Sequence, residues 1–69
     1  MTFGKRLREA RLKEHMTQPA LAEAIDVALR TYQSYEQDER LPTIYTLVSL
    51  ADILKVSTDY LLGRTDNKS

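Results

Sequence analysis

The chain has 69 residues, which allows one domain close to the smallest size that a single hydrophobic core stabilises without disulfides or metals. It contains no cysteine and one histidine, so a disulfide framework, a thiolate metal site and a histidine metal cluster are excluded. The formal net charge is zero, which argues against strong non-specific binding of nucleic acid, because phosphate contacts supply most of that affinity. A helical bundle is the economical fold for such a chain.

The charges are unevenly distributed along the chain. Residues 1–15 carry a positive surplus, which acidic residues elsewhere cancel. A local basic face is therefore compatible with a neutral chain. No apolar run approaches the roughly 20 residues that span a bilayer, and the N-terminus lacks the apolar region of a signal peptide. We expect a cytoplasmic protein without a membrane partner.

The first three helices are predicted from apolar spacing and from their start signals. Phe3, Leu7 and Ala10 recur at helical spacing and predict a helix over about residues 2–14. Thr17 is a suitable N-cap and Pro19 fits a first turn, so a second helix is expected over about 18–25. A third helix is expected over about 29–36, and no strand pattern interrupts the series.

The C-terminal half repeats these signals. Pro42-Thr43 precedes a fourth helix of about residues 44–54, and its apolar stripe contains Leu47, Leu50, Ala51 and Leu54. Ser57 is expected to cap a short fifth helix, which Gly63 ends. Residues 1–63 would then form the domain, and the polar residues 64–69 a flexible tail.

Residues 17–36 predict a short helix, a tight turn and a second short helix, with Leu21, Ile25, Val27 and Tyr32 at buried positions. Here the chain resembles the helix-turn-helix family of phage repressors, Cro proteins and related bacterial regulators, the Xre family. The resemblance extends from Phe3 to Gly63. Its most specific pieces are Thr17-Gln18-x-x-Leu21-Ala22, Tyr35-Glu36, Pro42-Thr43 and Val56-Ser57-x-Asp59-Tyr60-Leu61-Leu62-Gly63. It implies an all-α, compact five-helix domain of the lambda-repressor type, with the helix-turn-helix at helices 2 and 3.

The resemblance also implies which residues contact DNA. The exposed first turns of helix 3 would supply the base contacts, from Leu29, Arg30, Gln33 and Ser34. Arg30 suits guanine O6 and N7 and Gln33 suits adenine N6 and N7, although each could equally be a solvated surface side chain. Leu29 would touch a thymine methyl group or pack on the neighbouring helix. The expected phosphate contacts are Thr17, Gln18, Thr31, Gln37 and Arg40.

Other positions are interpreted as structural. Arg11 and Glu36 match family positions that form a partly buried ion pair between helix 1 and the end of helix 3. Tyr32 and Tyr35 could suggest base stacking, but their helical spacing favours the core, where the Tyr32 hydroxyl must find a partner or reach the surface.

Three positions where relatives usually carry glycine hold His15, Asp26 and Asp38 in this chain. Each follows a helix or forms the motif turn, where a positive φ is often required. Asn, Asp and His are the non-glycine residues most often found in that conformation. We predict a positive φ for at least one of the three.

The resemblance predicts a sequence-specific regulator of transcription that binds double-stranded DNA, most simply a repressor of phage or mobile-element type. Such proteins bind two-fold operators as homodimers, with half-sites about 34–36 Å apart. We expect the dimer contact at Leu41, Tyr60 and Leu61, and control by abundance, proteolysis or an antirepressor protein. No cofactor, metal, small-molecule ligand or catalytic residue is predicted.

Two alternatives remain open. The domain could have kept the fold as a protein-interaction module without binding DNA, which its zero net charge would allow. It could also be the DNA-binding module of a longer regulator.

Overall fold

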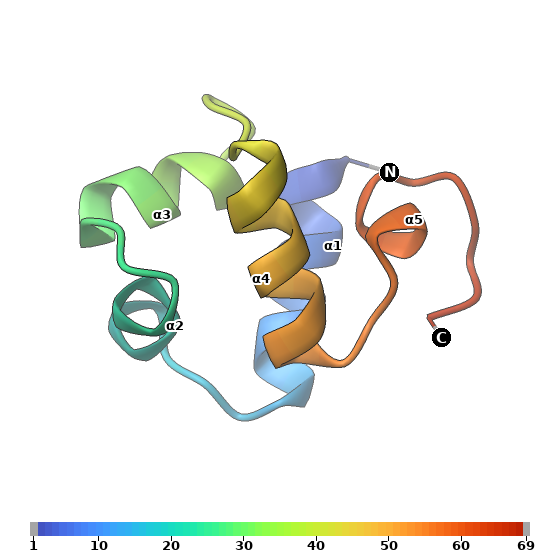
Figure 1. Cartoon of the computed structure of the whole chain (residues 1–69), viewed down its shortest axis with the longest axis horizontal. Coiled ribbons are helices and arrows are strands. Elements are labelled where there is room, and N and C mark those ends of the chain that lie inside the picture. Colours follow the sequence, from blue (N-terminus) through green and yellow to red (C-terminus); the bar gives the residue numbers. More distant parts are fainter. Residues whose placement is uncertain (1, 69) are drawn as a thin grey trace.

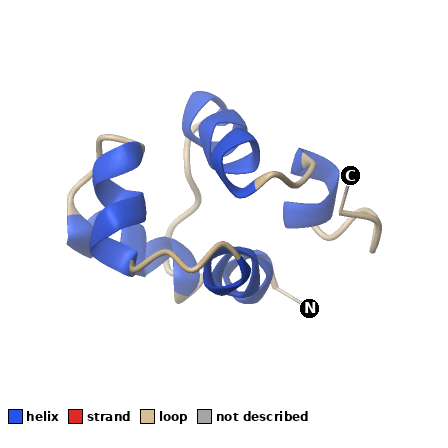
Figure 2. Cartoon of the chain, turned by 90° about the horizontal axis from the view of Figure 1, so that it is seen from below, coloured by secondary structure: helices blue, strands red, loops and turns tan. Residues whose placement is uncertain are grey.

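The computed structural model describes residues 2–68, and these residues form helices joined by loops, without a strand (Figure 2). The helices are α1 (Phe3–Lys13), α2 (Gln18–Ala24), α3 (Leu29–Glu36), α4 (Ile44–Leu54) and α5 (Thr58–Leu61). All five predicted helices are present in the predicted order, which confirms the all-α fold. None of the described helices is long and apolar enough to cross a membrane.

The helices surround one hydrophobic core. Figure 1 shows α4 in front of α1, with α2 and α3 at one end of the molecule and α5 at the other. Every helix contributes to the core, because each places an apolar side on the inside. The buried apolar residues are Leu7, Ala10, Leu21, Ala22, Tyr32, Tyr35, Leu50, Ala51, Leu54, Tyr60 and Leu61.

Four of these helices begin at a hydroxyl cap. The side chains of Thr2, Thr17, Thr43 and Ser57 each accept a hydrogen bond from the backbone N–H three residues later. Such a bond satisfies one of the amide groups that a helix leaves unpaired at its start. The exception is α3, which follows Ala28 and has no side-chain cap.

All five described helices end in the same left-handed turn. The residues with positive φ are His15, Asp26, Asp38 and Lys55, with φ between 58° and 60°, and Gly63 with φ 79°. After each turn, a backbone N–H donates to the carbonyl five residues earlier, as in Val27 N to Ala22 O at 3.0 Å. The prediction for the first three positions is confirmed at each of them, whereas Lys55 was not foreseen.

The start of α1 lies directly against the end of α3. A Cβ atom on Gly4 would stand 2.2 Å from the Glu36 carbonyl oxygen, so a larger residue would separate the two helices. The Gly4 N–H donates to Asp38 Oδ1 at 2.8 Å. Asp38 therefore has two functions, since it forms the left-handed turn after α3 and also anchors the first turn of α1.

Two residues that follow α5 contact the side chain of Arg6 on α1. Arg6 Nη1 donates to the carbonyl oxygens of Tyr60 at 3.0 Å and Thr65 at 2.7 Å, and its Nη2 lies 2.7 Å from Asp66 Oδ1. The Arg6 guanidinium also covers the Tyr60 ring at 4.6 Å from its centroid. These contacts join residues 65 and 66 to α1. The flexibility expected for residues 64–69 stays a prediction, and Ser69 lies outside the described residues.

The expected dimer contact also needs correction. Tyr60 is 5% exposed and Leu61 is completely buried, so both side chains belong to the core. Leu41 is exposed, as predicted, and it is followed by exposed apolar residues of α4, namely Ile44, Tyr45 and Val48. The apolar surface therefore lies on α4 and its approach, whereas α5 directs its large side chains inward.

The left-handed turn at Lys55 leads to a stability prediction. Lys55→Gly should stabilise the domain by about 0.5–1 kcal/mol, because glycine adopts a positive φ without the steric cost that a Cβ imposes. Urea unfolding measures the change. Lys55→Ala is the control, because it removes the same exposed ion pair with Glu14 but keeps a Cβ. Equal stabilities of the glycine and alanine variants would contradict the prediction.

Candidate functional site

Helices α2 and α3 form a tightly packed pair at one end of the molecule. Leu21, Ala22 and Tyr32 are buried between them and the rest of the core. Ala22 is 2% exposed, and its small side chain lets α3 cross close to α2. The turn between the helices needs only a few residues, because Asp26 adopts a left-handed conformation with φ 59°. This is the helix-turn-helix arrangement that the sequence predicts.

A buried carboxylate joins the first three helices. Arg11 Nε of α1 lies 2.6 Å from Glu36 Oε2 of α3, and the two side chains are 9% and 5% exposed. Gln18 of α2 donates from Nε2 to Glu36 Oε1 at 3.0 Å, and the Tyr32 hydroxyl donates to Glu36 Oε2. The expected ion pair is therefore part of a larger network with two further donors.

These contacts change the acid–base behaviour of the group. Burial by itself would raise the pKa of Glu36, but the hydrogen bonds from Arg11, Tyr32 and Gln18 outweigh it and hold that pKa below its ordinary value. The hydrogen bond to Glu36 is the main cause that raises the pKa of Arg11. Burial, followed by the hydrogen bond to Glu36, raises the pKa of Tyr32. The network therefore favours an ionised pair with a neutral tyrosine.

The same network continues to the exposed side of α3. Gln33 Nε2 donates to Gln18 Oε1 at 3.1 Å, so the two glutamines connect Glu36 to the surface. A side chain held in this way presents its amide in one orientation. Gln18 thus lies between Glu36 and Gln33, and its side-chain amide orients Gln33, one of the predicted base-contact residues.

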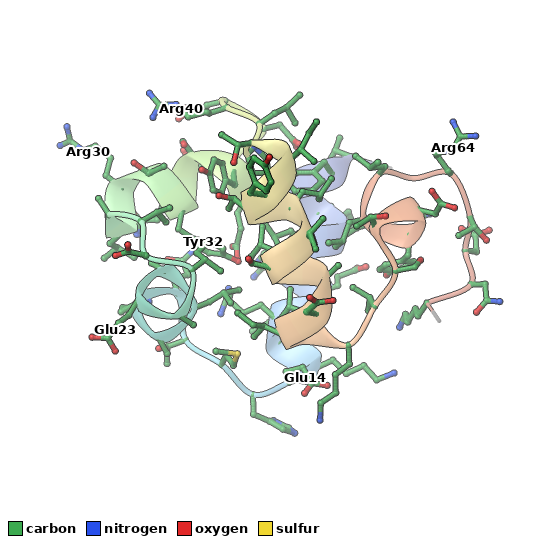
Figure 3. The ribbon with its side chains drawn as sticks, viewed as in Figure 1. Glu14, Glu23, Arg30, Tyr32, Arg40 and Arg64 are labelled. Atoms are coloured by element: carbon green, nitrogen blue, oxygen red, sulfur yellow. The ribbon has the colours of Figure 1, made fainter. Side chains whose placement is uncertain are left out.

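The remaining predicted contact residues lie along α3 and the loop after it. Arg30 and Arg40 both extend outward from this side of the molecule (Figure 3). Leu29 is 40% exposed, and Ser34 donates its hydroxyl hydrogen to Thr31 O at 2.6 Å, which leaves the hydroxyl oxygen available as an acceptor. Thr17 and Gln37 are exposed, and Thr31 and Ser34 are partly exposed.

A shallow hollow separates α3 from the following loop, and it was not predicted. It is lined by Arg30, Thr31, Ser34, Glu39 and Arg40. The acidic Glu39 lies among groups that would otherwise form a purely basic and hydroxyl surface. The sequence alone could not place Glu39 here, because the position depends on the turn that Asp38 makes.

The N-terminal basic residues divide into two kinds. Lys5 and Arg8 are exposed on α1, so either could face a phosphate or remain solvated. Arg6 does neither, because its guanidinium is buried against Tyr60 and the C-terminal residues. Its burial depends on partners more than 50 positions away, such as the Tyr60 carbonyl, which helical spacing cannot reveal.

The helix-turn-helix family model matches residues 7–61 of this chain. The chain belongs to the helix-turn-helix family. It is 44% identical over 66 residues to the transcriptional regulator ImmR of Bacillus subtilis. That match covers 96% of this chain and 52% of ImmR. It is 41% identical over 64 residues to the cryptic phage CTXphi transcriptional repressor RstR of Vibrio cholerae, covering 93% of this chain and 57% of RstR. The chain therefore spans little more than half of these relatives.

Solved structures of helix-turn-helix proteins have a fold similar to that of this chain. The P22 c2 repressor, solved in complex with a synthetic operator, superimposes with a TM-score of 0.85 at 32% identity. The match covers 90% of this chain and 94% of that one. These relatives place the chain in the Xre and phage-repressor branch, whose members regulate transcription and are not enzymes.

The Glu36 network predicts how stability depends on pH. Because the pKa of Glu36 is lower in the folded chain than its ordinary value of 4.5, its ionised form stabilises the fold at neutral pH. That stabilisation should begin to fall below about pH 4.5 and be lost as the pH drops through the folded-state pKa. Tyr32→Phe should remove about 1.5–3 kcal/mol at neutral pH, since it deletes a hydrogen bond to a charged group.

Urea unfolding at neutral and acidic pH tests both effects. The tyrosine variant should lose less stability on acidification than the unmodified protein. Without the Tyr32 hydroxyl one donor to Glu36 is missing, so the folded-state pKa of Glu36 is lowered less. Tyr45→Phe is the matched control, as Tyr45 is 86% exposed, and it should leave the whole pH profile unchanged. An unchanged profile for Tyr32→Phe would mean that its hydroxyl does not stabilise the carboxylate.

Proposed function

We propose that this chain binds double-stranded DNA in a sequence-specific way and regulates transcription, as a repressor of the phage type. The observation that carries the proposal is the exposed polar side of α3, which is held in place by the network around Glu36. An α-helix with such a side fits the major groove, where each base pair presents a distinct set of donors and acceptors. The operator-bound P22 c2 repressor, with its closely similar fold, supports this function.

In this arrangement Arg30 and Gln33 recognise bases by different means. Arg30 extends freely from the first turn of α3 and can offer two parallel donors to guanine (Figure 3). Gln33 is already hydrogen-bonded to Gln18, so its amide reaches the groove pre-oriented. Ser34 and Leu29 complete the base-facing row, with a hydroxyl oxygen that can accept from a base amino group and an apolar group for a thymine methyl.

The flanking residues position the helix on the backbone. Thr31 and Arg40 line the hollow beside α3, and Thr17 and Gln37 are exposed near the ends of the helix-turn-helix. Contacts of this type set the register on the duplex without reading its sequence. Glu39 in the same hollow would repel a phosphate and so weakens non-specific binding there.

A homodimer on a two-fold operator completes the proposal. One α3 helix contacts few base pairs, and a second copy on a half-site about 34–36 Å away would double the interface. The alternative is a protein-interaction module, which the zero net charge allows. The two functions differ in whether binding needs Arg30 and weakens with salt.

A random-sequence DNA selection with the purified protein at two salt concentrations tests the function. We expect an enriched two-fold symmetric site whose affinity falls with salt. Arg30→Ala should reduce affinity for that site by roughly 1–3 kcal/mol and relax the preference at one base pair.

Arg64→Ala is the control for the loss of one positive charge. Arg64 is exposed on the far side of the molecule from Arg30 (Figure 3), and it has only a long ion pair with Asp59. Its removal should leave the selected site unchanged. A folded protein that selects no sequence would exclude the proposed function and favour the interaction module.

A further inference from the structure

The loop between α3 and α4 forms one side of the hollow beside α3. Glu39 and Arg40 line the hollow from this loop, and the other lining residues belong to α3. Figure 1 shows the connection between α3 and α4 projecting from the molecule. Residues 37–41 are all exposed, so no buried side chain fixes this part of the loop. Its position therefore depends on hydrogen bonds.

The backbone attaches Glu39 and Arg40 to α3 at a single carbonyl. The Glu39 N–H and the Arg40 N–H both donate to Ser34 O, at 2.9 and 3.3 Å. Because the two donors share one acceptor and the second distance is long, these bonds hold Arg40 weakly. A further contact is needed to give Arg40 a defined place.

The side chain of Asp38 supplies such a contact, and it reaches a different helix. Its Oδ1 accepts a hydrogen bond from the Gly4 N–H at 2.8 Å, at the start of α1, where the helix dipole favours a carboxylate. Helix α1 is itself fixed in the core through Leu7 and Ala10. Glycine would adopt the φ of 60° at lower cost than Asp38 does, so the turn alone does not require an aspartate. The aspartate adds the bond that joins the loop to α1.

We propose that Asp38 is a positioning residue for Arg40, because its bond to α1 holds the loop where the Arg40 guanidinium meets a DNA phosphate. Arg40 extends outward (Figure 3) and forms no ion pair within residues 2–68, so its charge is available to a phosphate. A loop that is already ordered loses less conformational freedom on binding. The inference rests on the proposed DNA binding and adds a residue that acts on it without touching the DNA.

Charge alone predicts the opposite effect for the loss of this carboxylate. Asp38→Gly removes a negative charge beside a phosphate-binding loop, which by itself would tighten binding to any duplex. Positioning predicts weaker binding instead. The slope of log affinity against log salt concentration should become shallower by about one, as for the loss of one phosphate contact. Asp38→Asn keeps an acceptor oxygen and tolerates a positive φ, so it should retain the original slope.

A double-variant cycle identifies the residue that Asp38 positions. Arg40→Ala should also make the salt slope shallower by about one. The double variant of Asp38→Gly and Arg40→Ala should then bind as tightly as Arg40→Ala alone, since the contact can be lost only once. All of these affinities are measured on a duplex of random sequence, because every duplex offers phosphates. Additive losses in the double variant would overturn the assignment to Arg40.

Amide hydrogen exchange followed by NMR tests the anchor without DNA. Asp38→Gly should speed exchange of the Glu39 and Arg40 amides by at least about tenfold, because the loop loses a hydrogen bond to a charged group. Asp26→Gly is the matched control. Asp26 has a φ of 59°, but its side chain forms no hydrogen bond or ion pair within residues 2–68. Its replacement should leave the exchange of both loop amides unchanged.

The outcomes separate this inference from the proposed function. Unchanged exchange of the loop amides in Asp38→Gly would overturn the anchor. Tighter duplex binding by Asp38→Gly, or an unchanged salt slope, would overturn the positioning of Arg40. If the random duplex is bound as expected while no sequence is selected, the role of Asp38 stands and the sequence-specific function fails. A protein that binds no duplex would overturn both.

Discussion

The carboxylate of Glu36 is the group on which the arrangement of the first three helices depends. It is almost completely buried and would be costly to ionise without partners. Arg11 from α1, Gln18 from α2 and Tyr32 from α3 supply those partners. Any displacement of one helix would leave a charged or polar group unsatisfied, so the network specifies a single relative placement.

The local features of the fold follow from the sequence, because they arise from interactions a few residues apart. Hydroxyl caps such as Thr17 and Ser57 and the apolar stripes predict the helices nearly to the residue. Asp26 and Asp38 predict left-handed turns for the same reason. The left-handed turn at Lys55 could not be predicted in this way, because a lysine side chain does not favour a positive φ. The surrounding helices impose that conformation, and the hydrogen bond from Val56 N to Ala51 O stabilises it.

The features that sequence patterns missed are formed by residues distant along the chain. Arg6 looks like one more surface cation in a basic segment until Tyr60 and Thr65 are brought to it. Leu61 seemed available for a partner because a helix of one turn gives no periodicity from which to infer its buried side. In the candidate site, the resemblance to phage repressors indicated Arg11 and Glu36 correctly. The link from Gln18 to Gln33 required knowing how α2 and α3 cross.

That link constrains how such a protein can diverge. Arg30 extends from α3 away from the body, so on the proposed function its replacement can redirect base preference with little consequence for folding. Gln33 is hydrogen-bonded to Gln18, which is hydrogen-bonded to the Glu36 carboxylate. A substitution of Gln33 therefore alters this hydrogen-bond network as well as the proposed base contact. Related regulators should therefore acquire new operators first through position 30, with position 33 changing only when residue 18 changes with it.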